Sequence, residues 1–111
     1  TGVRDYIHVV DLAKGHVKAI EKQNFGVNIY NLGTGKGTSV LELINAFVKE
    51  NCVDVPYKIV SRRPGDVAIC YANASKALME LGWQAELTIE DMVRDAWRFE
   101  KGRIFNEKNI R

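Results

Sequence analysis

The five residues Arg62-Arg63-Pro64-Gly65-Asp66 carry the most interpretable chemistry in this chain. An arginine guanidinium presents planar, paired donors that match the oxygens of a phosphate. An aspartate carboxylate accepts hydrogen bonds from hydroxyl groups, such as those of a ribose. The Pro-Gly pair is typical of a tight turn, which would hold both kinds of group close together. The segment therefore predicts half of a nucleoside-diphosphate site; the alternative is a charged loop exposed to solvent.

The segment from Gly33 to Thr38 is a second candidate, because it is rich in glycine and lies between an expected strand and an expected helix. Such a position suits an anion held at a helix N-terminus. The spacing fits neither common phosphate motif. Tyr30 stands where a triphosphate loop needs glycine, and Thr38 stands where the dinucleotide fingerprint needs its third glycine. A flexible turn is the favoured interpretation, and a supporting role beside a ligand is the alternative.

No catalytic set of residues is visible. None of the tyrosines has a lysine four residues later, and no Ser-His-Asp order or nucleophile motif occurs. His8 and His16 fall on different expected elements, so no metal site is predicted, and His16 is expected to be at least half-buried. Arg4, Tyr6 and His8 would share one face of a strand, which alone indicates a solvated surface. Chemistry alone therefore indicates a binding module rather than a complete enzyme.

Composition narrows the class of protein. A chain of 111 residues with 46% hydrophobic residues is one domain's worth and can bury about two-thirds of its unfolded surface. Acidic and basic residues alternate around a net charge of +2, which is not the pattern of a nucleic-acid-binding surface. No apolar run reaches the roughly 20 residues of a membrane span, and no signal peptide is visible. Cys52 and Cys70 lack metal-ligand spacing, which favours reduced thiols in a cytoplasmic protein.

Periodicity predicts strands that alternate with helices, and hence an α/β domain with a small sheet. Short strands are expected over residues 4–10, 27–32 and 57–60, and residues 67–72 are expected to be extended. Helices are expected over residues 11–21, 40–51 and 75–81, with a last helix beginning near residue 89.

Several residues are expected to begin, end or face these helices. Asp11 is expected to cap the first helix, and Gly82 to end the third. Ser39 with Glu42, and Thr88 with Asp91, have the spacing of capping boxes. The first helix would carry one apolar face, and the last helix would turn five residues inward: Ile89, Met92, Val93, Ala96 and Phe99. Trp83 and Trp97 are expected in the core.

Several segments together resemble the C-terminal part of the UDP-glucose (UDP-galactose) 4-epimerases, in the extended short-chain dehydrogenase/reductase superfamily. Their order and spacing match from Gly2 to about Gly102. The matching segments are Arg4 to Val9, Asp11 to Ala13, Tyr30 to Gly35, Ser39-Val40, Arg62 to Asp66, Ala74 to Ala77 and Glu80 to Trp83. The form Arg-Asp-Tyr-Ile-His-Val favours the epimerases over the nucleotide-sugar dehydratases, which share the arginine turn.

The resemblance implies an architecture and a reaction. It implies a small C-terminal substrate-binding domain of an extended Rossmann-type enzyme, with short strands and about four helices, over residues 1–102, followed by a frayed tail over residues 103–111. NAD and the catalytic Tyr-Lys pair would belong to an N-terminal Rossmann domain. The chain begins Thr1-Gly2 without methionine, so we expect a piece of a longer protein, inactive alone. The parent would be a homodimer assembled mainly through that other domain.

The resemblance also implies roles for individual residues. Arg4 and Arg63 would meet the diphosphate of a UDP-sugar, with Pro64 and Gly65 shaping the turn. Asp66 would take ribose hydroxyls, and Val40 would pack near the nucleoside. Cys70 would stand beside the sugar, where family members vary between tyrosine and a small residue. Two alternatives remain: a stand-alone module for another anionic or nucleotide partner, and the equivalent domain of a related dehydratase.

Overall fold

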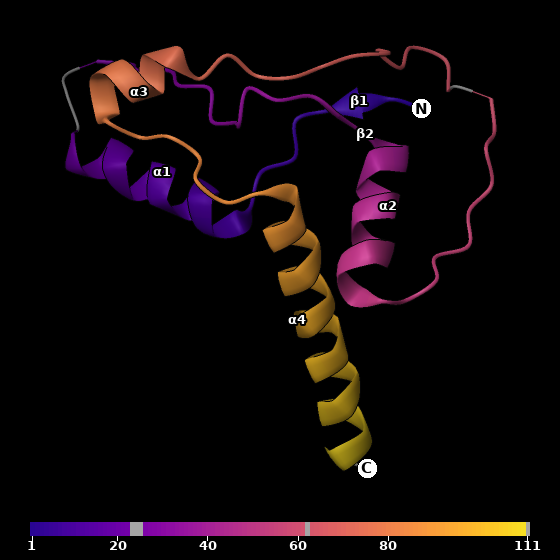
Figure 1. Ribbon diagram of the computed structural model, residues 1–111. Helices are drawn as coiled ribbons and strands as arrows, with labels where there is room; N and C mark the ends of the chain where they lie inside the picture. The colour runs from indigo at the N-terminus through magenta and orange to yellow at the C-terminus, as the bar shows by residue number, and fades with distance from the viewer. Residues whose placement is uncertain (23–25, 62, 111) are drawn as a thin grey trace.

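A computed structural model describes residues 1–22, 26–61 and 63–110, and only the backbone of residues 105–110. Its elements, in chain order, are β1 (Val3–Arg4), α1 (Val9–Glu21), β2 (Thr38–Ser39), α2 (Val40–Asn51), α3 (Ser75–Leu81) and α4 (Ile89–Ile110) (Figure 1). The expected α/β class, with four helices and a small sheet, is confirmed over the described residues. The helix bounds agree with those predicted to within about two residues, and the starts of α2 and α4 and the end of α3 carry local signals.

The sheet is two-stranded and joins distant parts of the chain. β1 pairs antiparallel with β2, with Val3 opposite Ser39 and Arg4 opposite Thr38. A parallel bridge adds Ile69 beside Val3. The predicted strand over residues 4–10 is therefore wrong beyond Arg4, since α1 already begins at Val9.

His8, rather than the predicted Asp11, caps α1. The Nδ1 atom of His8 accepts a hydrogen bond from the Val10 amide at 3.0 Å. Asp11 instead lies in the first turn, where its carboxylate accepts bonds from the amides of Glu86 and Leu87. Its side chain is only 1% exposed, so this bonding satisfies a buried charge. Asp11 thereby joins α1 to the segment that enters α4.

The core lies between α1 and α3. Ala77, Leu81 and Trp83 are buried there, and the indole Nε1 of Trp83 donates to the backbone oxygen of Asp11 at 2.9 Å. Gly15 allows this close approach, since a Cβ atom at that position would stand 2.7 Å from Leu32. The prediction that Trp83 is a core residue is confirmed.

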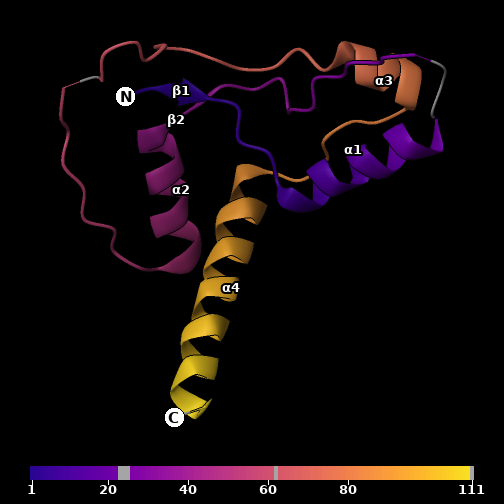
Figure 2. The same cartoon turned by 180° about the vertical axis from the view of Figure 1, so that it is seen from behind.

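A second contact joins α2 to α4, which run side by side in both views (Figures 1 and 2). The rings of Phe47 and Trp97 meet edge to face, with centroids 5.6 Å apart. Asn51 Nδ2 donates to the backbone oxygen of Val93 at 3.1 Å. Both predicted capping boxes are present, at the starts of α2 and α4. The far part of α4 projects away from the other elements (Figure 2).

Some predictions of burial and pairing are wrong. The runs expected to form strands over residues 27–32 and 57–60 are not strands in the described structure; Val27 is 91% exposed and Val60 is 73% exposed. A strand needs a neighbour for its backbone groups, and neither run has one among the described residues. Likewise His16 is exposed, and Phe99 on α4 is 73% exposed rather than inward. An apolar pattern in the sequence identifies side chains suited to burial, but it does not identify the part of the molecule that packs against them.

The C-terminal part of α4 continues helical through Ile110. The division at residue 102 and the frayed tail over residues 103–111 stay predictions, because fraying concerns motion. Across the described residues, no helix is both long and apolar enough to cross a membrane.

Candidate functional site

The predicted turn is present and is held by its own backbone. The Asp66 amide donates to the Arg63 oxygen at 3.1 Å, with Pro64 and Gly65 between them. Gly65 has a φ of 83°, the left-handed value that favours glycine at the third position of such a turn. Across the turn, Arg63 Nε donates to Asp66 Oδ2 at 3.1 Å. Arg62 lies outside the described residues.

Arg4 reaches the same region from β1. Pairing with β2 and with the Ile69 bridge fixes the backbone on either side of the strand. The guanidinium Nη1 donates to the backbone oxygen of Val3 at 2.8 Å. The Arg4 side chain is half-buried, so the prediction of a simple solvated face at this position is wrong. The short sheet therefore positions one cation of the candidate site.

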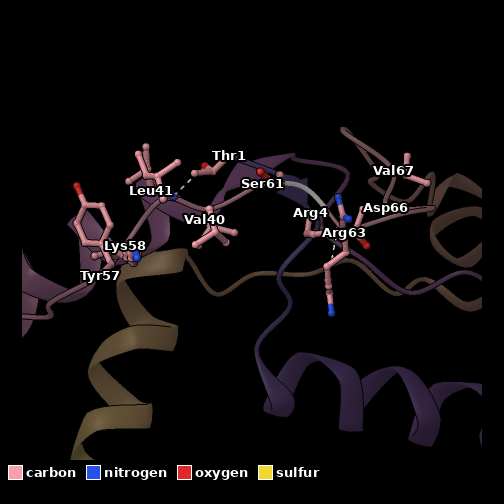
Figure 3. Close-up of a pocket in the computed structure, with 14 residues that line it drawn as sticks. Thr1, Arg4, Val40, Leu41, Tyr57, Lys58, Ser61, Arg63, Asp66 and Val67 are labelled. Carbon is pink, nitrogen blue, oxygen red and sulfur yellow. Dashed lines mark hydrogen bonds and ion pairs between the residues drawn. The ribbon is translucent and has the colours of Figure 1, made fainter.

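A cavity of about 530 Å³ brings four of the predicted site residues together: Arg4, Val40, Arg63 and Asp66. Figure 3 shows the two arginines and Asp66 gathered at one end of this cavity, with Leu41 and Tyr57 toward the other. The arrangement combines two guanidinium groups and a carboxylate with an apolar wall. It could hold a ligand that has an anionic part and a flat or apolar part.

The other predicted site residues lie outside the cavity lining. Pro64 and Gly65 form the turn itself. Cys70 is exposed. Its amide donates to the Val3 oxygen at 2.9 Å, and this bond holds the backbone of Cys70 beside β1 but does not place the thiol in the cavity. Whether these residues contact a ligand stays a prediction.

Sequence reasoning missed much of the cavity wall. Leu41 and Ile44 from α2, and Tyr57 and Lys58 from the following extended segment, also line it. The pattern at residues 57–60 was interpreted as a buried strand, although its position just before the arginine turn could have suggested a wall of the same site. Thr1 also lines the cavity, and no sequence pattern indicates this.

The glycine-rich loop holds an internal carboxylate. Asp5 accepts bonds from the Thr34 hydroxyl at 2.6 Å and from the Thr34 and Gly35 amides at 3.0 and 2.9 Å. A fourth bond comes from the Ala72 amide at 3.2 Å. Partial burial raises the pKa of Asp5, but these hydrogen bonds outweigh that effect and leave the pKa below its ordinary value. The loop therefore has a structural role, as the favoured interpretation expected.

The start of α2 also has its amides engaged. Val40 donates to the Gly2 oxygen at 3.1 Å, Leu41 to the Thr1 hydroxyl at 3.2 Å, and Glu42 to the Ser39 hydroxyl at 3.0 Å. In this conformation the first turn of α2 has no spare amide for an anion. The side chains of Arg4, Arg63 and Lys58 are thus the cationic donors of the cavity that suit a phosphate.

The two histidines serve no common site. His8 Nε2 lies 2.7 Å from Asp95 Oδ2 on α4, and since His8 Nδ1 accepts from an amide, Nε2 is the donor. His16 bonds to the Leu12 oxygen within α1. Within the ranges that the structure describes, no three His, Cys, Asp or Glu side chains are grouped as metal ligands.

Comparison with known proteins places these features in a family. The model of the family described as GDP-mannose 4,6 dehydratase matches residues 1–96. UDP-glucose 4-epimerase from Bacillus subtilis is 53% identical over 98% of this chain, which spans 33% of that relative. The chain thus spans about a third of the length of the curated relatives that it matches.

Solved structures of UDP-glucose 4-epimerases are also similar to this chain in sequence and fold. The UDP-glucose 4-epimerase of Bifidobacterium longum, in complex with NAD⁺ and UDP, is 65% identical, with a TM-score of 0.79 over 84% of this chain and 28% of that one. The Stenotrophomonas maltophila enzyme, with bound NAD and formylated UDP-arabinopyranose, is 49% identical, with a TM-score of 0.91 over 96% of this chain and 32% of that one. The resemblance to the C-terminal part of the UDP-glucose 4-epimerases is confirmed. The chain belongs to the GDP-mannose 4,6-dehydratase family, and its sequence and fold are similar to those of UDP-glucose 4-epimerases.

Proposed function

We propose that this chain is the C-terminal, UDP-sugar-binding part of an NAD-dependent UDP-glucose 4-epimerase, which interconverts UDP-galactose and UDP-glucose. The observation that carries the proposal is the cavity in which Arg4, Val40, Arg63 and Asp66 meet from three separate segments. The UDP named for the Bifidobacterium relative supports a uridine diphosphate as the ligand.

Each part of the cavity suits one part of the ligand. Arg4 and Arg63 bind the diphosphate, because their guanidinium groups supply charge-assisted donors at one end. Asp66 accepts from ribose hydroxyls. Val40 packs against the nucleoside, and Tyr57 extends that apolar wall. Cys70 stands beside the sugar ring, outside the cavity that holds the nucleotide.

NAD, when bound, supplies reversible hydride transfer at the sugar C4. The described residues do not fit this cofactor, because the Thr34 and Gly35 amides of the glycine-rich loop are bonded to Asp5 and no dinucleotide fingerprint is present in the sequence. The cofactor and the catalytic Tyr-Lys pair therefore belong to an N-terminal Rossmann domain of the same longer protein. That protein is expected to be a cytoplasmic homodimer.

Turnover by the full-length protein tests the proposal. With NAD present, it should convert UDP-galactose to UDP-glucose, and Arg4→Ala should raise KM for the sugar nucleotide. Arg98→Ala, which removes an exposed arginine on α4 away from the cavity, is the matched control and should leave KM unchanged. Absence of conversion by the folded, NAD-loaded protein would reject the epimerase assignment.

The description of the matching family model favours a dehydratase as the second candidate. The two reactions give different products from a nucleotide sugar. An epimerase inverts C4 and conserves mass, whereas a 4,6-dehydratase releases water and leaves a keto sugar. Mass spectrometry of the product distinguishes them, and the epimerase names of relatives at 53–66% identity favour the first.

A further inference from the structure

Arg63 and Asp66 contact each other across the turn. The Arg63 side chain is 84% exposed, and its Nε donates to Asp66 Oδ2, while Asp66 is 31% exposed. Among the described residues, no other hydrogen bond or ion pair of the Arg63 side chain is found. Its direction at the edge of the cavity therefore depends on this one pair.

The ion pair with Asp66 occupies only part of the Arg63 guanidinium. A guanidinium has five N–H donors, and the bond to Asp66 takes the one on Nε. The terminal Nη groups stay available for a bidentate bond to phosphate. An arginine free to rotate would lose side-chain entropy on binding, and a pair formed beforehand lessens that loss.

We propose that Asp66 is a positioning residue for Arg63, directing its guanidinium at the phosphate before the ligand arrives. This role is additional to the contact with ribose, and it rests on the proposed function of the same cavity. Removing a carboxylate beside Arg4 and Arg63 should by itself strengthen binding of an anion; losing the position of Arg63 should weaken it.

Inorganic pyrophosphate separates the two roles of Asp66, because it has phosphates but no ribose. Calorimetry on the full-length protein would compare pyrophosphate and UDP binding in wild type, Asp66→Asn, Arg63→Ala and the double variant. Glu100→Gln is the matched control, since it removes the acid of another arginine pair, which lies on α4 and outside the cavity lining. We expect Asp66→Asn to weaken pyrophosphate binding about 2- to 5-fold, the range of an exposed ion pair.

The double variant gives the sharper readout. In the Arg63→Ala background, Asp66→Asn should no longer weaken pyrophosphate binding, because there is no guanidinium left to position. The Nε–H resonance of Arg63 should also shift in Asp66→Asn, which a general change in the turn's stability would not require. Equal or tighter pyrophosphate binding by Asp66→Asn, or a full effect without Arg63, would overturn the proposal.

Failure of the proposed function has a different signature. A wild-type protein that binds UDP no better than pyrophosphate would reject the uridine assignment, while the coupling between Asp66 and Arg63 could still be measured with pyrophosphate. A wild type that binds neither ligand would overturn the positioning role as well, since the cavity would then hold no phosphate.

Discussion

At the scale of the residue, Arg63 is the side chain whose removal should matter most for ligand binding. It lines the cavity with Arg4 and is exposed enough to reach a ligand. Adjacent side chains at an extended entry to a turn point to opposite sides, so only one of the two neighbouring arginines can face the cavity. The resemblance assigns that role to Arg63 rather than Arg62.

Arg63→Ala should therefore weaken UDP binding by the full-length protein by roughly 10- to 150-fold, which corresponds to about 1.5–3 kcal/mol for a charge-assisted bond to phosphate. Arg62→Ala should have a much smaller effect, and NAD affinity should hardly change in either variant. Calorimetric titration with UDP measures both. A larger loss of UDP affinity in Arg62→Ala than in Arg63→Ala would mean that Arg62, and not Arg63, faces the cavity.

The small side chain of Cys70 leads to a prediction about which UDP-sugars the full-length protein accepts. A thiol is much smaller than a phenol ring, so the position leaves space for an N-acetyl group beside the sugar's 2-position. The full-length protein should turn over UDP-N-acetyl sugars, and Cys70→Tyr should remove that activity while retaining turnover of UDP-galactose. Equal N-acetyl turnover in both proteins would show that Cys70 does not control this space.

Cys52 ends α2 in the left-handed conformation, with a φ of 54°, where a side chain is strained. Cys52→Gly should relieve this strain, whereas the greater conformational freedom of glycine in the unfolded chain opposes the gain. The net result should be a free energy of unfolding that is higher by about 0.5–1 kcal/mol. Urea denaturation measures the change. Gly82→Ala, at a left-handed φ of 66° with open space around it, is the reciprocal control and should lower stability by about 1 kcal/mol.

At the scale of the elements, Asp5 organises the molecule around the cavity. Its carboxylate joins the segment after β1 to the glycine-rich loop and to the segment that ends at Ala72. Because Arg4 precedes Asp5 directly, these bonds also fix the chain next to one cation of the site. A loop rich in glycine suits this role, since its amides can close around the carboxylate without side chains in the way.

Asp5→Ala should lower the free energy of unfolding by about 2–3 kcal/mol, because the Thr34, Gly35 and Ala72 amides lose their acceptor. The pH dependence has a definite sign. The pKa of Asp5 is lower in the folded than in the unfolded state, so its contribution is fully present above about pH 5 and is lost as the pH falls through the folded-state pKa. Urea denaturation at a series of pH values should therefore show that the free energy of unfolding falls less steeply with decreasing pH in Asp5→Asn than in wild type. Identical pH dependence in the two proteins would contradict this role of Asp5.

At the scale of the whole molecule, the described chain leaves many large apolar side chains uncovered. Val9, Ile20 and Met79 are 71%, 72% and 84% exposed. We propose that these side chains are buried against further parts of a longer enzyme. The relatives, about three times as long, provide the setting for that proposal.

The isolated 111-residue chain, supplied with NAD and UDP-galactose, should therefore give no UDP-glucose, because hydride transfer needs a nicotinamide site and a positioned base, both of which we propose belong to the N-terminal domain. It should also bind the dye ANS strongly, unlike the full-length protein, since its apolar surface is open. A coupled assay for UDP-glucose and a fluorescence titration test the two parts. Robust turnover by the chain alone would overturn the division of labour between two domains.

Local signals let the sequence determine the helices. Ser39 with Glu42, Thr88 with Asp91, and Gly82 lie within a few residues of the helix ends that they specify, so their chemistry is complete without the rest of the chain. The Pro64-Gly65 turn is equally local. These features could be predicted from residue types and spacing alone, whereas the strands on which the α/β class was predicted were mostly placed wrongly.

Only the tertiary structure decided which distant groups meet. Asp5 contacts Thr34 and Ala72 at sequence separations of 29 and 67 residues, and Asp11 contacts Glu86 and Leu87 at separations of 75 and 76. Periodicity cannot identify such partners, because it records which face of an element is apolar and not what lies against it. For the same reason the runs at residues 27–32 and 57–60 were predicted as strands: a strand exists only where a neighbour pairs with its backbone, and that neighbour is a property of the assembled fold.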